Sequence, residues 1–488
     1  MRLALSIALS LLVADGASAQ AFDREAWRQD YAQLKEELVA RYANLAWKAS
    51  PSGGVDLPAL DRKTNAALAA AGDDGAATDA IRAFILGFHD GHLSEISHLA
   101  PATAPSAEPE RATLDPQAPV AGCAALGYAS TGAVAFSLPF EGLPGFRLVS
   151  DGLASTFRAG LVDRSGVRIG VIRIQNFTAR AFPAACLHAW ADLRRAGRAI
   201  TRQEVRDATR LRWFQDMAEA VQLLHAAGAT ALLLDIGNDS GGDDSGDWAA
   251  RLFTDRPVQS ARLMMADAPE SSGYFDEQIE GIDALPAAPR TAAAKAALAE
   301  ARVFFARQKA ALGTRHCDLS WAWSTQRAWS PTSCDRLLAA GYAGGYAAGL
   351  PRGAMGDREA AMALASSAEV EPFYGSWTGP TYVLADRRSY SSAEMFAALM
   401  QDNRIAKIVG ARTGGDGCGF MTDGEPIVLR HSRLRFRVPN CMRLRADGSN
   451  EEAGIAPDIA VVPTEGESDR ARGERALNLV ARDLAARH

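Results

Sequence analysis

Two strand–helix–strand patterns, far apart in the chain, constrain the fold more than any other feature. Each consists of a short apolar run, a helical stretch and a second apolar run. The segments are Val167–Ile174, Gln203–Ala227 and Ala229–Ile236 in the first pattern, and Pro380–Ala385, Ala393–Gln401 and Ala406–Gly410 in the second. Such alternation is typical of βαβ units, whose strands run parallel because the helix carries the chain back across the sheet. The sequence therefore predicts an α/β fold whose sheet is built from two separate regions of the chain.

The N-terminal region is predicted to be helical. Apolar residues recur every three or four positions in one continuous helix that we predict over Asp23–Trp47: Trp27, Tyr31, Leu34, Leu38 and Tyr42. Further helices are predicted over Leu57–Ala71 and Thr78–Phe88. Together these helices form a predicted N-terminal cap that ends at the segment His89–His92.

Composition divides the remainder of the chain. Residues 101–118 are rich in Pro, Ala and Glu and are predicted to be a linker. Residues 266–375 are rich in Ala and contain a predicted helix over Thr291–Leu312, so we expect a large, mainly helical insertion; a last helix is predicted over Ala471–Arg487. The predicted units are a signal peptide (1–19), the N-terminal helical cap (20–100), a linker with a small β segment (101–165), the first segment of the core domain (166–265), the insertion (266–375) and the second segment of the core domain (376–488).

The first residues resemble a secretory signal. Arg2 precedes the apolar run Leu3–Ala14, and Ala17-Ser18-Ala19 offers a small-x-small cleavage site. No later run reaches the ~18 apolar residues of a membrane-spanning helix. We therefore expect an exported protein, periplasmic or secreted, without a membrane span.

Charge and cysteine content limit the partners and cofactors. The net charge of −6 and the absence of a Lys/Arg block argue against nucleic-acid binding. Six cysteines follow the signal, an even number that favours disulfides in an oxidising compartment; the simplest of the possible pairings are Cys317–Cys334 and Cys418–Cys441. No Cys/His spacing indicates structural zinc. We predict no cofactor and no metal site, although five residues crowd one segment with irregular spacing: His89, Asp90, His92, Glu95 and His98.

Two loops at predicted strand ends carry candidate chemistry. Ser391 lies where the strand Tyr382–Ala385 gives way to a helix, and the positive end of a helix dipole stabilises an alkoxide. The alternative interpretation is that Ser391 only caps the helix. The second loop, Gly237–Gly242, follows the strand that ends at Asp235, and its glycines allow backbone N–H groups to approach a ligand. Its alternative interpretation is a flexible turn.

Three motifs follow one another along the chain. They are Asp235…Gly241-Gly242, Ser391-x-x-Glu394 with the following Thr413-x-Gly415-x-Gly417, and Gly454-Ile455-Ala456-Pro457-Asp458. In this order they resemble the carboxy-terminal-processing (tail-specific) serine peptidases, whose superfamily includes the tricorn protease core and the interphotoreceptor retinoid-binding proteins. The resemblance implies a ClpP/crotonase-like core, Ser391 as the nucleophile and Glu394 as a supporting carboxylate. It also implies an oxyanion hole formed by three residues: Gly241, Gly242 and Ser392.

The chain departs from the tail-specific pattern at the catalytic base. Asp416 stands where that family has its lysine, and an aspartate cannot act as a desolvated lysine base. The tricorn-type branch instead supplies a histidine from the N-terminal block, oriented by a glutamate. His92 and Glu451 stand at the matching places, so the resemblance implies that His92 is the general base and Glu451 its orienting partner. The interval before Arg168 lacks a recognisable PDZ domain.

These observations favour an exported serine peptidase that cleaves peptides or unfolded protein segments through an acyl-enzyme on Ser391. Two alternatives stay open at this point: a non-catalytic ligand- or protein-binding member of the same fold, which the absent lysine supports, and an esterase or amidase acting on a small substrate. Acyl transfer needs the same groups in each enzymatic case. The oligomeric state is not predicted.

Overall fold

The computed structural model describes residues 22–96, 111–128, 134–314, 317–331, 336–422 and 424–486. Some segments and residues for which the sequence makes predictions lie outside the described ones: the signal peptide 1–19, the beginning of the linker, His98 and Cys334. Among the described helices, none combines the length and the apolar character that crossing a membrane requires.

A seven-stranded mixed sheet forms the centre of the molecule, in the order β13-β9-β8-β5-β4-β3-β2. Its strands β4, β5, β8, β9 and β13 are parallel, as the two βαβ patterns predict, whereas β2, β3 and β4 form an antiparallel meander. The strands are β2 (Phe146–Asp151), β3 (Arg158–Arg164), β4 (Val167–Arg173), β5 (Ala231–Asp235), β8 (Thr381–Ala385), β9 (Lys407–Gly410) and β13 (Ile459–Ala460). The meander continues the core sheet, and the described residues between 111 and 164 show no separate PDZ domain.

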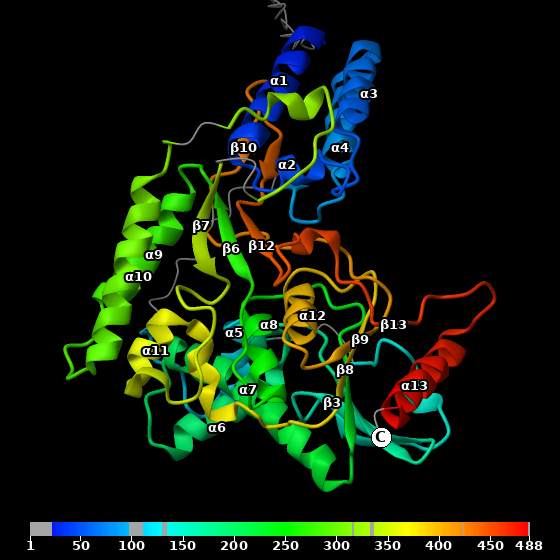
Figure 1. Ribbon diagram of the computed structural model, residues 1–488, viewed down its shortest axis with the longest axis vertical. Coiled ribbons are helices and arrows are strands. Elements are labelled where there is room, and N and C mark those ends of the chain that lie inside the picture. The colour runs from blue at the N-terminus through cyan, green and yellow to red at the C-terminus, as the bar shows by residue number, and fades with distance from the viewer. Residues whose placement is uncertain are drawn as a thin grey trace, which may run out of the picture.

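Helices cover both faces of this sheet. Leu232 and Leu234 of β5 pack on one side against the buried aromatic residues of α7 and α12, while Leu233 packs on the other side with α13. This alternation follows from the two-residue period of a strand. The helices on the first face are α6 (Pro183–Arg195), α7 (Arg202–Ala226), α8 (Ser245–Ala249) and α12 (Ser392–Asp402), and α13 (Asp469–Ala485) lies on the second (Figure 1).

The N-terminal helices form a unit above the core in Figure 1. They are α1 (Arg24–Arg41), α2 (Leu45–Lys48), α3 (Leu57–Ala70) and α4 (Asp74–Leu86). The prediction of one continuous helix over Asp23–Trp47 is wrong, because the chain is extended at Tyr42. There the Tyr42 hydroxyl donates to the buried Asp90 carboxylate at 2.6 Å, and the Ala43 N–H donates to Pro439 O at 3.2 Å. These tertiary contacts interrupt a pattern that is locally helical.

Distant segments complete this N-terminal unit. A small antiparallel sheet joins it to the second half of the chain, in the order β1 (Ser94–Glu95), β11 (Arg435–Arg437) and β10 (Ile427–Val428). The Asp30 carboxylate accepts the N–H groups of His431 and Ser432 at 2.9 and 2.7 Å. The cap therefore packs directly on the region of the chain that follows Ser391.

The segment predicted to be a mainly helical insertion (266–375) also contributes one strand, and a second strand ends at its first residue, Ala266. The helices are α9 (Ser271–Asp283), α10 (Ala292–Ala310) and α11 (Arg358–Leu364). The strands β6 (Arg262–Ala266) and β7 (Leu337–Tyr342) pair with β12 (Cys441–Leu444) in an antiparallel sheet of order β12-β6-β7. Sequence analysis did not predict this sheet, because one of its strands comes from a separate region of the chain.

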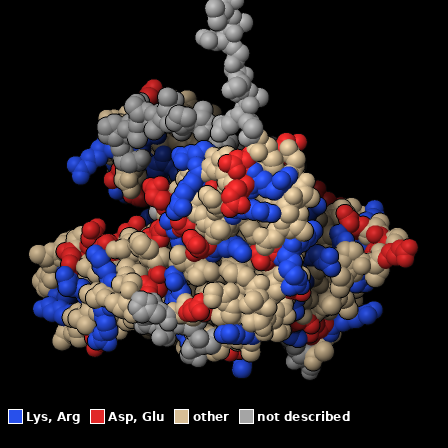
Figure 2. Space-filling view, turned by 90° about the horizontal axis from the view of Figure 1, so that it is seen from above, with Lys and Arg blue, Asp and Glu red and all other residues tan. Residues whose placement is uncertain are grey.

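Disulfides and short elements complete the fold. The predicted pair Cys418–Cys441 is confirmed, and Cys123–Cys186 joins α5 to α6, whereas the predicted pair Cys317–Cys334 includes a residue outside the described ones. Basic and acidic side chains are interspersed over the face shown in Figure 2. The remaining elements are α5 (Pro119–Ala125) and the 3₁₀ helices η1 (Phe140–Gly142), η2 (Ala179–Ala181), η3 (Ala250–Phe253), η4 (Ser320–Trp323), η5 (Ala354–Gly356), η6 (Ser366–Phe373) and η7 (Glu451–Ala453).

Candidate active site

Ser391 occupies a sharp turn between β8 and the first residue of α12. Its backbone has φ of 55° and ψ of −116°, a conformation that non-glycine residues rarely adopt and that folded proteins retain mostly at functional positions. Neighbouring residues fix the turn: the Tyr390 N–H donates to Asp239 O at 2.9 Å, and the Ser389 hydroxyl donates to Ile236 O at 2.8 Å. The nucleophile candidate is thus held against the loop that follows β5.

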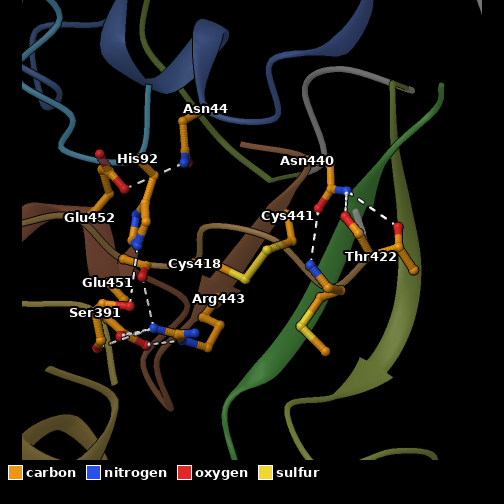
Figure 3. Close-up of a disulfide and its surroundings, with 12 residues drawn as sticks. Asn44, His92, Ser391, Cys418, Thr422, Asn440, Cys441, Arg443, Glu451 and Glu452 are labelled. Atoms are coloured by element: carbon orange, nitrogen blue, oxygen red, sulfur yellow. Dashed lines mark hydrogen bonds and ion pairs between the residues drawn. A yellow bond between two sulfur atoms is a disulfide. The ribbon is translucent and has the colours of Figure 1, made fainter. Parts of the chain in front are cut away.

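His92 reaches Ser391 from the N-terminal region of the chain. Its Nε2 lies 3.2 Å from Ser391 Oγ (Figure 3). Its Nδ1 lies 3.1 Å from the backbone oxygen of Asp416. A carbonyl oxygen can only accept a hydrogen bond, so the bond to Asp416 O places the proton of a neutral imidazole on Nδ1. Nε2 is then free to accept the hydroxyl proton of Ser391. This geometry suits a general base.

Asp416, which stands where the resembling family has a lysine, supports His92 in two ways. Its carbonyl accepts from the imidazole, and its carboxylate accepts the Gly91 N–H at 2.9 Å, one residue before His92. Burial raises the pKa of the Asp416 carboxyl, while the Gly91 hydrogen bond opposes that shift. The sequence indicated that Asp416 cannot replace the lysine base of the tail-specific pattern. No motif indicated that its backbone carbonyl would bind the imidazole of His92.

The Glu394 carboxylate joins the start of α12 to the turn that carries Asp416. Burial raises the pKa of Glu394 to about 7, although its hydrogen-bond donors oppose the shift. The carboxylate lies beside Ser391, as expected, and it is also the acceptor of five hydrogen bonds that form a larger hub. The five donors are the Ser391 N–H (3.1 Å), the Thr413 hydroxyl (2.6 Å) and the N–H groups of Gly415 (2.7 Å), Asp416 (2.8 Å) and Gly417 (3.3 Å).

Glu451 lies near the site but pairs with Arg443 and not with His92. The guanidinium binds both carboxylate oxygens, with Nε 2.9 Å from Oε2 and NH2 2.8 Å from Oε1, and both side chains are buried (Figure 3). The expected orienting bond to His92 is instead made by the Asp416 carbonyl. Arg443 also donates to Gly417 O at 2.8 Å and to Ser391 O at 3.4 Å. Arg443 thus joins Glu451 to the backbone of Ser391 and Gly417. No sequence motif indicated this arginine.

The three residues expected to form an oxyanion hole differ in what their N–H groups contact. The Gly241 N–H donates to the Asp239 carboxylate at 2.7 Å, so it is not available to a substrate. Gly241 instead allows close approach: a Cβ there would lie 2.7 Å from Ser391 Cβ, and its φ is +98°. Among the hydrogen bonds of the described residues, none is donated by the N–H of Gly242 or Ser392. These two groups are the donors left beside Ser391.

The Asp239 carboxyl is expected to make stability depend on pH. Burial raises its pKa well above the usual range, and Oδ2 has no hydrogen-bond partner among the described residues. Because the pKa of Asp239 is higher in the folded than in the unfolded protein, its protonated form contributes to the free energy of unfolding. This contribution is complete below the unfolded pKa of ~3.9. It is lost as pH rises toward the folded pKa, by up to about 1.4 kcal/mol per pH unit. Asp239→Asn keeps an acceptor for Gly241 and does not ionise. Thermal unfolding between pH 5 and 8 should therefore show a shallower decline for this variant, and equal declines would contradict the argument.

Metal ligation finds no support in the described regions of the chain, where no group of three or more His, Cys, Asp or Glu side chains is arranged to hold an ion. In the segment where such residues crowd together, Asp90 accepts the backbone N–H of His92 at 2.9 Å and the Tyr42 hydroxyl. Glu95 forms an ion pair with Arg82 at 2.6 Å. These side chains therefore have structural partners.

Comparisons with known proteins agree with this architecture. The family model described as Peptidase family S41 matches residues 168–461. No curated protein matches the chain in sequence. The crystal structure of mature CPAF has a TM-score of 0.52 and 15% identity, over 94% of this chain and 97% of that chain.

Two further solved structures are more distant in shape. Mature CPAF complexed with lactacystin has a TM-score of 0.42 and 16% identity. The match covers 73% of this chain and 59% of that chain. The photosystem II D1 C-terminal processing protease has a TM-score of 0.32 and 13% identity, over 90% of this chain and 95% of that one. At these identities the likeness concerns the fold alone.

Proposed function

Because the chain belongs to peptidase family S41 and is therefore a serine-type peptidase, we propose that Ser391 is its nucleophile and His92 its general base. The observation that carries this proposal is the 3.2 Å separation between His92 Nε2 and Ser391 Oγ, together with the Nδ1 contact to Asp416 O that leaves Nε2 as an acceptor. No lysine is needed in this arrangement, which resembles the tricorn-type branch more than the tail-specific one.

The reaction follows from these positions. Ser391 Oγ attacks the peptide carbonyl carbon while its proton passes to His92 Nε2. Collapse of the tetrahedral intermediate breaks the C–N bond, and the imidazolium returns the proton to the departing amine. A water molecule then attacks the acyl-enzyme with His92 again as the base, which releases the carboxylic acid and restores Ser391.

Backbone groups beside Ser391 would stabilise the oxyanion. The N–H groups of Gly242 and Ser392 fit this role, and losing one such donor typically costs about 3 kcal/mol in the barrier. Glu394 would hold the turn in place. Glu451 would act through Arg443, whose guanidinium also contacts the backbone of Ser391 and Gly417.

The substrates we propose are peptides or unfolded protein segments outside the cytoplasm. The disulfides of the structure support an oxidising compartment, and the first residues of the sequence support export. We also propose that the mixed sheet is a ClpP/crotonase-like core, with residues 20–100 as its cap and 266–375 as an insertion.

Covalent labelling of the whole protein with a fluorophosphonate tests the nucleophile. Intact-mass analysis should show one adduct, and peptide mapping should place it on Ser391. Ser391→Ala should abolish the adduct, whereas Ser52→Ala, which removes an exposed serine of the N-terminal cap, should leave it unchanged. A folded protein that never forms the adduct would contradict the proposal and favour a ligand-binding role for this fold.

A further inference from the structure

Lys48 is a buried lysine at the end of α2. Its ammonium lies 2.7 Å from Glu452 Oε1 and 3.2 Å from His89 O, and its side chain is almost inaccessible to solvent. Lysine is rarely buried without a partner, because an isolated charge is costly to remove from water. Glu452 Oε1 accepts no other hydrogen bond among the described residues, so the lysine is its partner.

One contact of Lys48 reaches the segment that carries His92. His89 begins the segment His89–His92, whose later residues are held by carboxylates: Gly91 N–H by Asp416 and His92 N–H by Asp90. His89 itself has φ of 51°, so its backbone adopts a conformation that needs support from its surroundings. The Lys48 ammonium supplies a donor at this bend.

The other contact, with Glu452, leads to the turn that binds the imidazole. Glu452 packs against the turn Gly415–Gly417: a Cβ on Gly417 would lie 2.7 Å from Glu452 Oε2, and a Cβ on Gly415 would lie 2.8 Å from Glu452 O. This turn presents the Asp416 carbonyl that binds His92 Nδ1. Lys48 therefore lies between the two segments that fix the ring.

The neighbourhood of Lys48 is rich in acidic groups. Burial raises the pKa of the carboxyls of Asp416 and Glu452, and the charge of Asp90 adds to this shift, whereas the Lys48 ammonium opposes it. Asn44, from the start of α2, donates to Glu452 Oε2 at 3.4 Å (Figure 3). The titratable and charged groups that face this cluster are Tyr42, Lys48, Asp90, His92, Glu394, Asp416 and Glu452.

We propose that Lys48 is a positioning residue for catalysis: by bridging His89 O and the Glu452 carboxylate, it holds the His89–His92 segment against the Gly415–Gly417 turn and so aligns His92 with Ser391. The proposal rests on the function proposed above, in which His92 is the base. It includes the N-terminal helices in the catalytic unit, because α2 supplies the cation that joins the two segments.

A double-mutant cycle tests this role. Lys48→Met keeps an unbranched side chain, one atom shorter, and removes the charge. It should lower the rate of fluorophosphonate labelling of Ser391 by about 100-fold, since a shift of about 1 Å at a reacting group has that effect. The acid limb of its pH–rate profile should also move, which loss of packing alone would not cause. Lys48→Met/Glu452→Gln also removes the carboxylate that would otherwise stay buried without its cation. It does not restore the bridge to His89 O, so it should label no more than about 10-fold faster than Lys48→Met.

Lys35→Met is the matched control. Lys35 forms an ion pair with Asp61 at 2.8 Å within the same N-terminal unit but away from His92. This variant should label at the wild-type rate with an unchanged pH profile. Lys48→Arg retains a cation and should label faster than Lys48→Met.

Hydrogen exchange provides a readout that does not depend on activity. The amides of Gly91 and His92 should exchange about 10-fold faster or more in Lys48→Met than in wild type, because their acceptors are no longer held in place. Unchanged exchange and unchanged labelling would overturn the role of Lys48. A double variant that labels at the wild-type rate would overturn it too, because the loss in Lys48→Met would then come from the unpaired Glu452 carboxylate and not from the missing bridge. If exchange rises while wild-type Ser391 itself is never labelled, the positioning contact stands and the proposed function fails.

Discussion

Replacing His92 by alanine is expected to lower kcat for peptide hydrolysis by about 10⁶-fold, as loss of the base does in other serine peptidases. The 3.2 Å contact from Nε2 is the path by which Ser391 Oγ can lose its proton. Among the described residues, no other side chain donates to or accepts from Ser391 Oγ. Steady-state hydrolysis of an unfolded protein substrate, together with fluorophosphonate labelling of Ser391, measures the effect.

His225→Ala is a suitable control for this experiment. His225 is exposed near the end of α7 and its ring packs against Trp377, so its removal should leave hydrolysis unchanged. If His92→Ala retained the wild-type rate, the base would have to be another group. The Lys48 positioning role would then lose its premise, since it acts through His92.

Glu394→Gln is expected to destabilise the protein by about 3 kcal/mol or more, because buried donors that lose their acceptor cost about 1–3 kcal/mol each. The carboxylate accepts five hydrogen bonds, while a glutamine amide offers one oxygen and turns its NH2 toward the remaining donors. The turn that presents the Asp416 carbonyl should loosen, and labelling of Ser391 should fall by about 100-fold.

Denaturant unfolding and the labelling rate, measured on the same preparation, check both effects. Glu300→Gln, which changes an exposed glutamate in the middle of α10, should alter neither quantity. A Glu394→Gln protein as stable and as reactive as wild type would show that the donors find other acceptors. The hub would then have no role in holding the nucleophile.

The sequence predicted helices and strands correctly where the apolar residues follow a clear period and no tertiary contact interrupts the element. The strands β4, β5, β8 and β9 are apolar runs that the sheet buries on both faces, and α7 and α12 lie within a few residues of their predicted ranges. The prediction failed at Tyr42, where the helical period continues but the tyrosine leaves the helix to bind Asp90. It also failed for the sheet β12-β6-β7, since strand pairing between distant segments leaves no local pattern.

For the candidate site, motif order indicated candidate residues but not all of their contacts. Ser391 and His92 are brought within hydrogen-bond distance, as the resemblance implied. Gly241 was expected to donate to an oxyanion, but its N–H binds Asp239. Glu451 was expected beside His92, but its carboxylate binds Arg443. A motif records which side chain is present, and hydrogen-bond competition in the folded chain decides which partner it takes.

The sequence by itself determined the α/β class, the family resemblance and the residue types available for acyl transfer. These depend on short-range periodicity and on motifs that are contiguous in the chain. Only the tertiary structure decided that the Asp416 carbonyl fixes the imidazole, that Arg443 holds Glu451 and that Lys48 joins the two segments around His92. These contacts join residues far apart in the sequence or depend on the backbone, and burial selects them because each polar group removed from water must find a partner nearby.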